Sequence, residues 1–230
     1  MDNSVTFAIG DVHGCFGKLD FLMAACDLLS ESEDARFVFI GDYVDRGPDA
    51  RKVIDFLIQS QHREAGRFIC LRGNHEAMLI DAASKKRSEL DLINWLANGG
   101  DQTLDSYGVN DPRALPADHL AWIKALPLKY YDQKRLYVHA GIRPGVSIVD
   151  QSEEDLLWIR EPFLSSDDDH GAFVVHGHTP TESGLPDLRS NRLNIDTGAC
   201  FGGQLTAAIF TSAQLIPSLF CSDSGDFWQP

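Results

Sequence analysis

Hydrophobic residues follow two alternating patterns in the first third of the chain. Short runs of β-branched and aromatic residues predict strands at 5–9, 37–40 and 68–71. Apolar residues at helical spacing follow the first two runs, at 19–26 and 53–58, and a further helix is predicted to begin at Glu76. Strand–helix–strand alternation of this kind is typical of parallel βαβ units.

The rest of the chain is predicted to be helical first and then rich in strands. Residues 84–127 are mostly helical by pattern, with a break at 98–100 and a new helix after Pro116. Later strands are predicted at 136–139, 173–176, 193–196 and 205–210. Because the joins between them are short and rich in turn residues, we expect antiparallel pairing in this half. The predicted fold class is α/β, with two mixed β-sheets in a central sandwich flanked by helices.

Length and charge narrow the class of protein. The chain has 230 residues, enough for one large domain, or one domain with a small cap, that buries its core without disulfides. It carries 20 Lys and Arg against 34 Asp and Glu, a formal net charge of −14. Nucleic-acid backbones are bound through basic patches, so we expect no nucleic-acid partner. The same charge should repel an anionic substrate unless a local feature reverses the field.

Nothing in the sequence indicates secretion or a membrane. Residues 1–4 lack the charged and apolar regions of a signal peptide, and the longest apolar run, Phe21 to Cys26, is too short to span a bilayer. The five cysteines are odd in number and form no C-x-x-C pair. We therefore expect a cytoplasmic protein with no membrane partner.

Polar residues flanked by glycine follow five of the predicted strands. The segments are GDVHG at 10–14, GDYVDRG at 41–47, RGNHE at 72–76, VHAG at 138–141 and HGHTP at 176–180. Functional groups of α/β sheets lie just past the carboxyl ends of the strands. These ends supply Asp, Asn and His, a mixed oxygen and nitrogen set that suits Mn²⁺, Fe or Zn²⁺ better than Ca²⁺.

The spacing predicts a site for two divalent metal ions. Two ions that share a carboxylate, about 3.5–4 Å apart, form a clamp for in-line displacement at phosphorus. Asp42 is the natural bridge because it follows the central one of the first three strands. We expect one ion to be held by Asp11, His13 and Asp42, and the other by Asp42, Asn74, His139 and His178. A hydroxide between the ions would be the nucleophile.

Each motif taken alone has a simpler explanation. An Asp-x-His pair is common by chance, a buried histidine is usually a packing residue, and Asn74 could be a helix cap. His176 lies two residues from His178 and could face the same way. Five motifs at five predicted strand ends make coincidence improbable.

The motifs GDVHG, GDYVDRG, LRGNHE, VHAG and HGHTP, in this order, resemble the phosphoprotein phosphatase (PPP) family of metallophosphoesterases. The segments WLANGG at 95–100 and IDTGA at 195–199 resemble its compact bacterial and phage branch of serine/threonine protein phosphatases. The resemblance implies the calcineurin-like metallophosphoesterase fold. It also implies one catalytic domain over 1–230, with a helical cap-like segment at about 77–131.

The resemblance also implies roles for individual residues. The metal ligands match the six residues above, with His178 rather than His176 as the last ligand, and Mn²⁺ is the expected metal. His75 resembles the general acid, Asp45 the carboxylate that orients it, and Arg46 a phosphate-binding arginine; Arg160, in LWIRE at 157–161, resembles a second one. We expect Arg72 and Glu76 to be structural, Asp196 to support the site from behind, and three further histidines to lie at the surface: His62, His119 and His170.

The function implied is a metal-dependent phosphomonoesterase that acts on phosphorylated Ser or Thr, with Tyr left open. Its partner would be a phosphorylated protein or peptide, or a small phosphate ester. One alternative is hydrolysis of dinucleoside polyphosphates, as by bis(5'-nucleosyl)-tetraphosphatases, although that related branch departs from GDYVDRG at the second Asp. Another is a metal-binding scaffold without catalysis, which would not need an intact set of ligands, acid and arginines.

Overall fold

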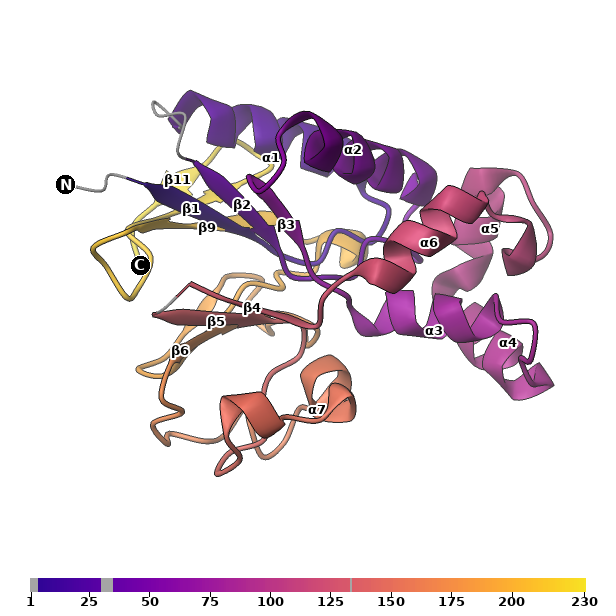
Figure 1. Ribbon diagram of the computed structural model, residues 1–230. Helices are drawn as coiled ribbons and strands as arrows, with labels where there is room; N and C mark the ends of the chain where they lie inside the picture. Colours follow the sequence, from indigo (N-terminus) through magenta and orange to yellow (C-terminus); the bar gives the residue numbers. More distant parts are fainter. Residues whose placement is uncertain (1–3, 30–34, 133) are drawn as a thin grey trace.

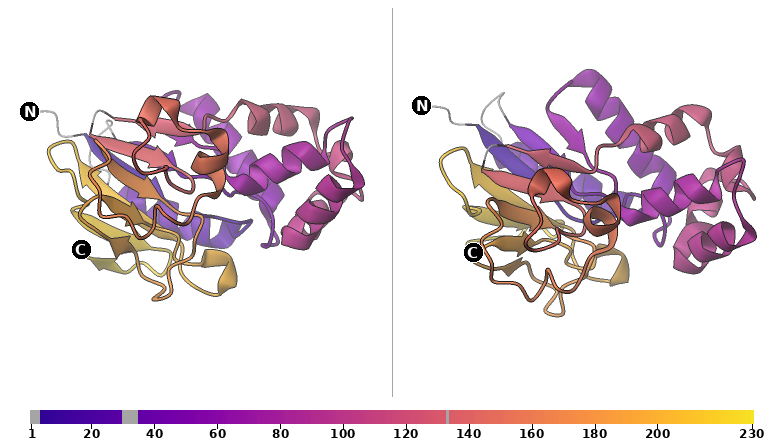
Figure 2. Two further views of the ribbon diagram at one scale, coloured as in Figure 1. Left: turned by 90° about the horizontal axis from the view of Figure 1, so that it is seen from below. Right: turned by 60° about the horizontal axis from the view of Figure 1, so that its bottom comes forward.

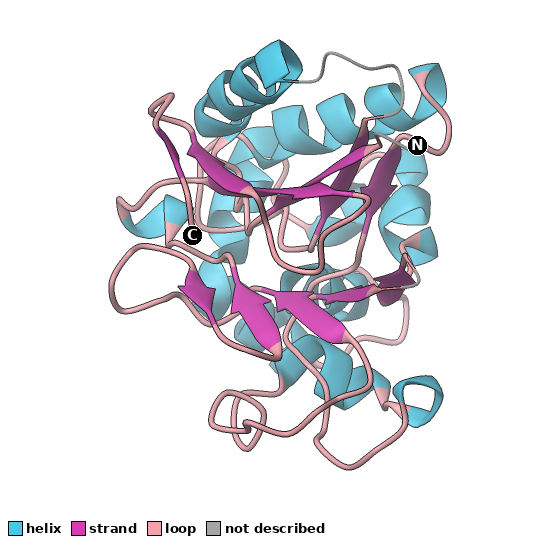
Figure 3. Cartoon of the chain, turned by 90° about the vertical axis from the view of Figure 1, so that its left-hand side faces the viewer, coloured by secondary structure: helices cyan, strands magenta, loops and turns pink. Residues whose placement is uncertain are grey.

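Two β-sheets face each other in the computed structural model, and helices cover their outer faces (Figures 1 and 3). The structure describes residues 4–29, 35–132 and 134–230. Its helices are α1 Phe16–Leu29, α2 Ala50–Arg63, α3 Asn74–Ala82, α4 Glu89–Trp95, α5 Asp101–Tyr107, α6 Ala117–Ala125 and α7 Glu153–Trp158. Its strands are β1 Val5–Ile9, β2 Arg36–Phe39, β3 Phe68–Cys70, β4 Lys129–Tyr131, β5 Arg135–Val138, β6 Phe173–His176, β7 Asp187–Leu188, β8 Arg192–Asn194, β9 Thr206–Thr211, β10 Leu219–Ser222 and β11 Phe227–Trp228.

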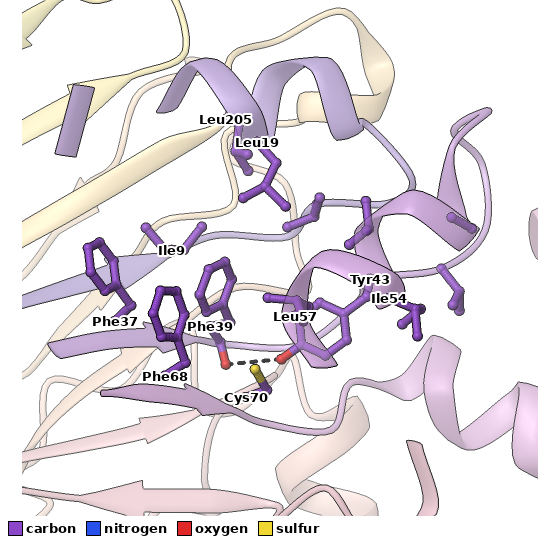
Figure 4. Close-up of a cluster of buried hydrophobic side chains, with 14 of the residues drawn as sticks. Ile9, Leu19, Phe37, Phe39, Tyr43, Ile54, Leu57, Phe68, Cys70 and Leu205 are labelled. Carbon is purple, nitrogen blue, oxygen red and sulfur yellow. Dashed lines mark hydrogen bonds between the residues drawn. The ribbon is translucent and has the colours of Figure 1, made fainter. Parts of the chain in front are cut away.

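The first sheet has the strand order β11-β10-β9-β1-β2-β3. Strands β1, β2 and β3 are parallel, as the alternation of strands and helices predicted, and β9 to β11 are antiparallel to their neighbours. Phe7, Phe37 and Phe68 lie opposite one another on the parallel strands, with ring centroids 4.9 and 5.0 Å apart. This aromatic row belongs to the core cluster on the face that α1 and α2 cover. Figure 4 shows Phe37 and Phe68 of the row, with Leu19 of α1 and Leu57 of α2 in the same cluster.

The second sheet has the order β4-β5-β6-β8-β7, and its three central strands are parallel. The expectation of antiparallel pairing was therefore wrong for β5, β6 and β8, whereas β4 and β7 at the edges are antiparallel. Parallel neighbours need crossover connections of a dozen residues or more. The segments after β5 and β6 are such crossovers, and the first contains α7. Both sheets are mixed, as predicted.

The buried side chains form three layers. Successive side chains on a strand point to opposite faces, so each sheet contributes to the layer between the sheets and to a layer under its own helices. On β1, Phe7 and Ile9 pack against α1 and α2, while Ala8 faces the second sheet. Tyr137 and Leu193 of the second sheet join Ala8 in the layer between the sheets. A third layer lies between the second sheet and α7.

The four helices α3 to α6 lie together at one end of the sandwich (Figure 2). They follow the carboxyl end of β3, so they adjoin the edge where β1, β2 and β3 all end. Among the described residues, no helix is both long enough and apolar enough to span a membrane.

Candidate active site

The carboxyl ends of β1, β2, β3, β5 and β6 meet at one edge of the sandwich, and the six predicted metal ligands lie there together. Asp42 is central: its Oδ2 lies 3.3 Å from His13 Nε2, and its Oδ1 lies 3.4 Å from His139 Nε2. Asn74 Oδ1 lies 2.8 Å from His139 Nε2 and 2.9 Å from His178 Nδ1. The backbone N–H of His178 donates to the sixth residue, Asp11, at 3.1 Å. The two oxygens of Asp42 thus face different histidines, as a bridging carboxylate requires.

The orientation of the imidazoles is set from behind by backbone carbonyls. His13 Nδ1 donates to the carbonyl of Val44 at 2.9 Å, and His139 Nδ1 donates to the carbonyl of Ile40 at 3.0 Å. A carbonyl only accepts, so the proton sits on Nδ1 and the Nε2 lone pair faces the cluster. This arrangement is typical of histidines that ligate metals.

Backbone strain is concentrated at this edge. Among the described residues, the non-glycine residues with a positive φ are His13, Asp42, Asp45, Arg46 and His178, with φ from 43° to 68°. Each such residue costs of order 1–3 kcal/mol, and such strain is a feature of functional sites. All five were predicted as site residues from the sequence.

Glu76 holds one of these strained turns in place. Its buried carboxylate accepts the backbone N–H of Asp42 at 2.8 Å, of Tyr43 at 2.7 Å and of Gly73 at 2.9 Å. Two glycines of the motifs are also required, because a carboxylate of the cluster lies too close to each of them for a side chain to fit. A Cβ on Gly73 would lie 2.1 Å from Asp42 Oδ1, and one on Gly177 would lie 2.1 Å from Asp11 Oδ1. Glu76 is structural, as predicted.

Asp45 and His75 form a buried pair beside the cluster. His75 Nδ1 donates to Asp45 Oδ2 at 2.7 Å, and His75 Nε2 lies 4.0 Å from Asp42 Oδ2. Two further residues, which sequence reasoning missed, donate to the Asp45 carboxylate: the Trp95 indole at 3.0 Å and the Thr103 hydroxyl at 2.7 Å. Trp95 belongs to the WLANGG segment that carries the resemblance, but nothing in that segment indicated a partner for its indole N–H, and Thr103 carried no signal.

The two predicted arginines lie on different sides of the cluster. Arg46 Nη1 lies 2.8 Å from His13 Nε2, and its guanidinium stacks over the ring of Phe201 at 5.2 Å. Arg160 is exposed and lines a hollow that also includes Trp158 and His178. Arg46 therefore reaches the cluster itself, whereas Arg160 lies at its rim.

Burial sets the charge of the ligands. It lowers the pKa of His139 to about 3 and that of His178 to about 2, so both imidazoles are neutral. Burial raises the pKa of Asp11, and the nearby carboxylates of Asp196 and Asp42 raise it further. Oδ1 of Asp11 is buried without a hydrogen-bond partner. Neutral imidazoles, crowded carboxylates and an unpartnered oxygen fit divalent cations.

Among the described residues, two groups of three side chains could each hold an ion, since the ligand atoms within each group lie within 4.8 Å of one another. They are His13, Asp42 and His75, and Asp42, His139 and His178. The second group agrees with the predicted set. The first group differs from the predicted set, because it contains His75 in place of Asp11. Asp11 contacts the other ligands through the hydrogen bond that it accepts from the backbone N–H of His178.

Other histidines lie apart from the cluster. His176 is fully buried, packs against Phe163 and lies 3.4 Å from Arg192 Nη1, so it is a packing residue. The prediction that His119 lies at the surface was wrong. It is 7% exposed, because it faces α5 and its Nδ1 pairs with the hydroxyl of Tyr107 at 2.9 Å.

The fold and the site define a metallophosphoesterase. The family model described as calcineurin-like phosphoesterase matches residues 5–205, and the chain belongs to this family. It is therefore a hydrolase, and the resemblance noted from its motifs is confirmed.

Two of the relatives that match this chain have different activities in their names. Serine/threonine-protein phosphatase 1 of Salmonella typhimurium is 33% identical over 214 residues, covering 88% of this chain and 90% of that protein. An asymmetrical bis(5'-nucleosyl)-tetraphosphatase of Geobacillus is 26% identical over 239 residues, covering 90% and 91%. Among solved structures, a cold-active protein tyrosine phosphatase matches with a TM-score of 0.71 at 16% identity, covering 100% of this chain and 80% of that one, a likeness of fold.

Proposed function

We propose that this metallophosphoesterase is a protein phosphatase that releases phosphate from phosphoserine and phosphothreonine side chains. The observation that carries the proposal is the buried pair in which His75 donates to Asp45 at 2.7 Å. With Nδ1 committed to Asp45, Nε2 of His75 is the atom that can give a proton to a leaving oxygen.

The leaving group decides whether such a proton is needed. The alkoxide of serine or threonine is a strong base, so its departure is greatly assisted by a general acid, which contributes about 10²–10⁴-fold. Burial lowers the pKa of His75 to about 4, and the Asp42 charge opposes this. A bound phosphate dianion adds negative charge beside the imidazole and favours its protonated form further.

We propose that the metal ligands are Asp11, His13, Asp42, Asn74, His139 and His178, and that Mn²⁺ is the metal in both positions. When bound, the two ions would activate water as the nucleophile and offset the charge of the phosphate. The chain's own part is to hold these ligands in fixed orientations, through the backbone carbonyls behind His13 and His139.

The arginines complete the phosphate site in this proposal. Arg46, beside His13, would form paired hydrogen bonds with the outer phosphate oxygens, as a planar guanidinium does. Arg160 would contribute from the rim, next to His178. Both add positive charge in a protein whose net charge is −14.

The second candidate is hydrolysis of dinucleoside polyphosphates. It is supported by the relative named as a bis(5'-nucleosyl)-tetraphosphatase, which is 26% identical to this chain. A nucleotide leaves as a phosphate anion that is far less basic than an alkoxide, so it gains little from an acid. The intact Asp45–His75 pair supports the first candidate for this reason.

A direct comparison of substrates tests the proposal. The Mn²⁺-loaded protein should hydrolyse p-nitrophenyl phosphate and a panel of phosphoserine and phosphothreonine peptides, with kcat/KM at least about tenfold above that for diadenosine tetraphosphate. Phosphotyrosine peptides in the same panel decide the question left open from the sequence. A preference for the tetraphosphate would favour the second candidate, and no hydrolysis with Mn²⁺, Co²⁺ or Ni²⁺ would exclude both.

We also propose that residues 1–230 act as one catalytic domain, with the helical segment at about 77–131 beside the site, and that the protein works in the cytoplasm. Cysteine usage, five thiols with no C-x-x-C pair, supports the second point. The helices α3 to α6, packed at the end of the sandwich where the candidate site lies, support the first.

A further inference from the structure

A short segment between α4 and α5 brings two side chains to the same carboxylate. Trp95 ends α4, the chain then kinks within Leu96–Gly100, where Asn98 and Gly99 have non-helical backbone angles, and Thr103 lies in the first turn of α5. Trp95, Thr103 and Asp45 are all fully buried, so water does not compete for the bonds among them.

In the hydrogen bonds between these side chains and the Asp45 carboxylate, Trp95 and Thr103 are the donors and the carboxylate is the acceptor. The Trp95 indole N–H donates to both carboxylate oxygens, at 3.1 and 3.0 Å. The Thr103 hydroxyl donates to Oδ1 at 2.7 Å and accepts the backbone N–H of Asp45 at 2.8 Å. With the His75 donor, this carboxylate has three side-chain partners, and all of them donate. Burial raises the pKa of Asp45, and the hydrogen bonds from Thr103 and Trp95 oppose this by stabilising the ionised form, which is the form that accepts from His75.

The same segment also fixes the neighbouring arginine. The carbonyl of Gly99 accepts the backbone N–H of Arg46 at 3.1 Å. A Cβ on Gly99 would lie 2.8 Å from that nitrogen, so only glycine fits there. Asp45 and Arg46 both have a φ of 68°, and each is bonded to this segment. Two strained residues of the candidate site are thus held by one turn of the helical segment.

We propose that Trp95 and Thr103 are positioning residues for proton transfer by His75. They favour the ionised form of Asp45 and hold its carboxylate in one orientation, and Asp45 in turn keeps the His75 proton on Nδ1 and aims Nε2 at the leaving oxygen. This inference rests on the proposed function, because it assigns His75 the role of general acid. It adds that residues of α4 and α5, outside the metal cluster, determine how well the acid works.

A merely structural role would have a different signature. A variant that only loosens the fold should slow all substrates alike, because every step depends on the fold. Loss of acid positioning should slow substrates with basic leaving groups more than p-nitrophenyl phosphate, whose leaving group departs with little help from a proton. The dependence of kcat/KM on the leaving group separates the two roles.

The test compares matched variants of the Mn²⁺-loaded protein on p-nitrophenyl phosphate and on phenyl phosphate. Thr103→Val removes the hydroxyl at nearly constant shape, Thr103→Ser keeps it, and Trp95→Phe removes the indole N–H. Tyr107→Phe is the control, since it deletes another buried hydrogen bond in α5, to His119, without touching Asp45. His75→Asn provides the reference for complete loss of the acid.

We expect Thr103→Val and Trp95→Phe to lose about tenfold more kcat/KM on phenyl phosphate than on p-nitrophenyl phosphate, a part of the 10²–10⁴ that an acid supplies. Thr103→Ser should restore the wild-type ratio of the two substrates, and Tyr107→Phe should keep it. Equal losses on both substrates in Thr103→Val and Trp95→Phe, while His75→Asn is selective, would overturn the inference alone. If His75→Asn is itself unselective, the acid assignment in the proposed function is wrong.

Discussion

The substitution Gly73→Ala tests whether Asp42 is the shared ligand of the candidate metal site. Gly73 precedes Asn74 at the start of α3, and its Cα faces the Asp42 turn. A methyl group there would lie 2.1 Å from Asp42 Oδ1 and 2.4 Å from the Asp42 backbone nitrogen. Ordinary contacts are 3.4 Å or more, so the carboxylate or the backbone must retreat by roughly 1 Å.

The retreat has two expected costs. Overpacking of a well-packed interior costs about 1–3 kcal/mol of the free energy of unfolding. Asp42 Oδ1 faces His139 and also accepts the backbone N–H of His75 at 3.0 Å, so its movement disturbs both the ligands and the acid. A misplacement of about 1 Å lowers catalysis by about 10²-fold, and loss of support around a ligand weakens metal affinity about 10–100-fold.

Calorimetric titration with Mn²⁺ and kcat/KM on p-nitrophenyl phosphate measure these effects. The matched control is Gly17→Ala in α1, where an added methyl meets nothing within 4 Å and should stabilise the helix slightly. Gly73→Ala with unchanged Mn²⁺ affinity and unchanged activity would refute the idea that Asp42 is a shared, tightly placed ligand.

Two other predictions concern stability. Removing divalent ions with a chelator should lower the Tm, because Asp11 and Asp42 are then buried close together without a cation. Adding Mn²⁺ should restore the Tm in a concentration-dependent way. A Tm that responds to neither addition would contradict the metal site. Asp111→Asn should destabilise the protein at pH 7, because Arg113 and Arg87 hold the pKa of Asp111 well below its ordinary value. Since the folded pKa is the lower one, this contribution is present above about pH 4 and is lost as the pH falls further, so denaturant unfolding of the two proteins should converge in acid.

The location of the candidate site could be predicted because polar residues interrupt apolar strands at their carboxyl ends. The first three strands were assigned by pattern, and parallel strands place their ends at one edge. Asp11, Asp42 and Asn74 therefore came together from local sequence alone. The hydrophobic pattern did not show whether the later strands, β5, β6 and β8, run parallel or antiparallel to one another.

The parallel arrangement of β5 and β6 was missed because their connection was interpreted as a set of turns. It is a crossover that includes α7, and it places the ends of β5 and β6 at the same edge as those of the first sheet. His139 and His178 reach Asn74 for this reason. Antiparallel β5 and β6 would have put them at opposite edges.

The support of Asp45 could not be predicted by periodicity. Trp95 has the apolar spacing of a core residue, and its ring does pack against Gly100. Its single polar atom makes the functional contact, and hydrophobic pattern ignores that atom. Thr103 lies 58 residues from Asp45, so only the folded chain shows the pair.

The net charge of −14 takes on a specific meaning at the site. Asp11, Asp42, Asp45 and Asp196 are each at most 4% exposed and lie around one edge of the sandwich. Burial raises the pKa of Asp45, Asp11 and Asp196 alike, and the hydrogen bonds that Asp45 accepts from Thr103 and Trp95 oppose that rise. Divalent ions would reverse the sign of this region locally, while the chain as a whole stays negative. A dinucleoside tetraphosphate carries several charges outside the reacting phosphate, whereas a phosphopeptide need present only one phosphate. We therefore expect the net charge of the protein to disfavour the tetraphosphate more than the phosphopeptide.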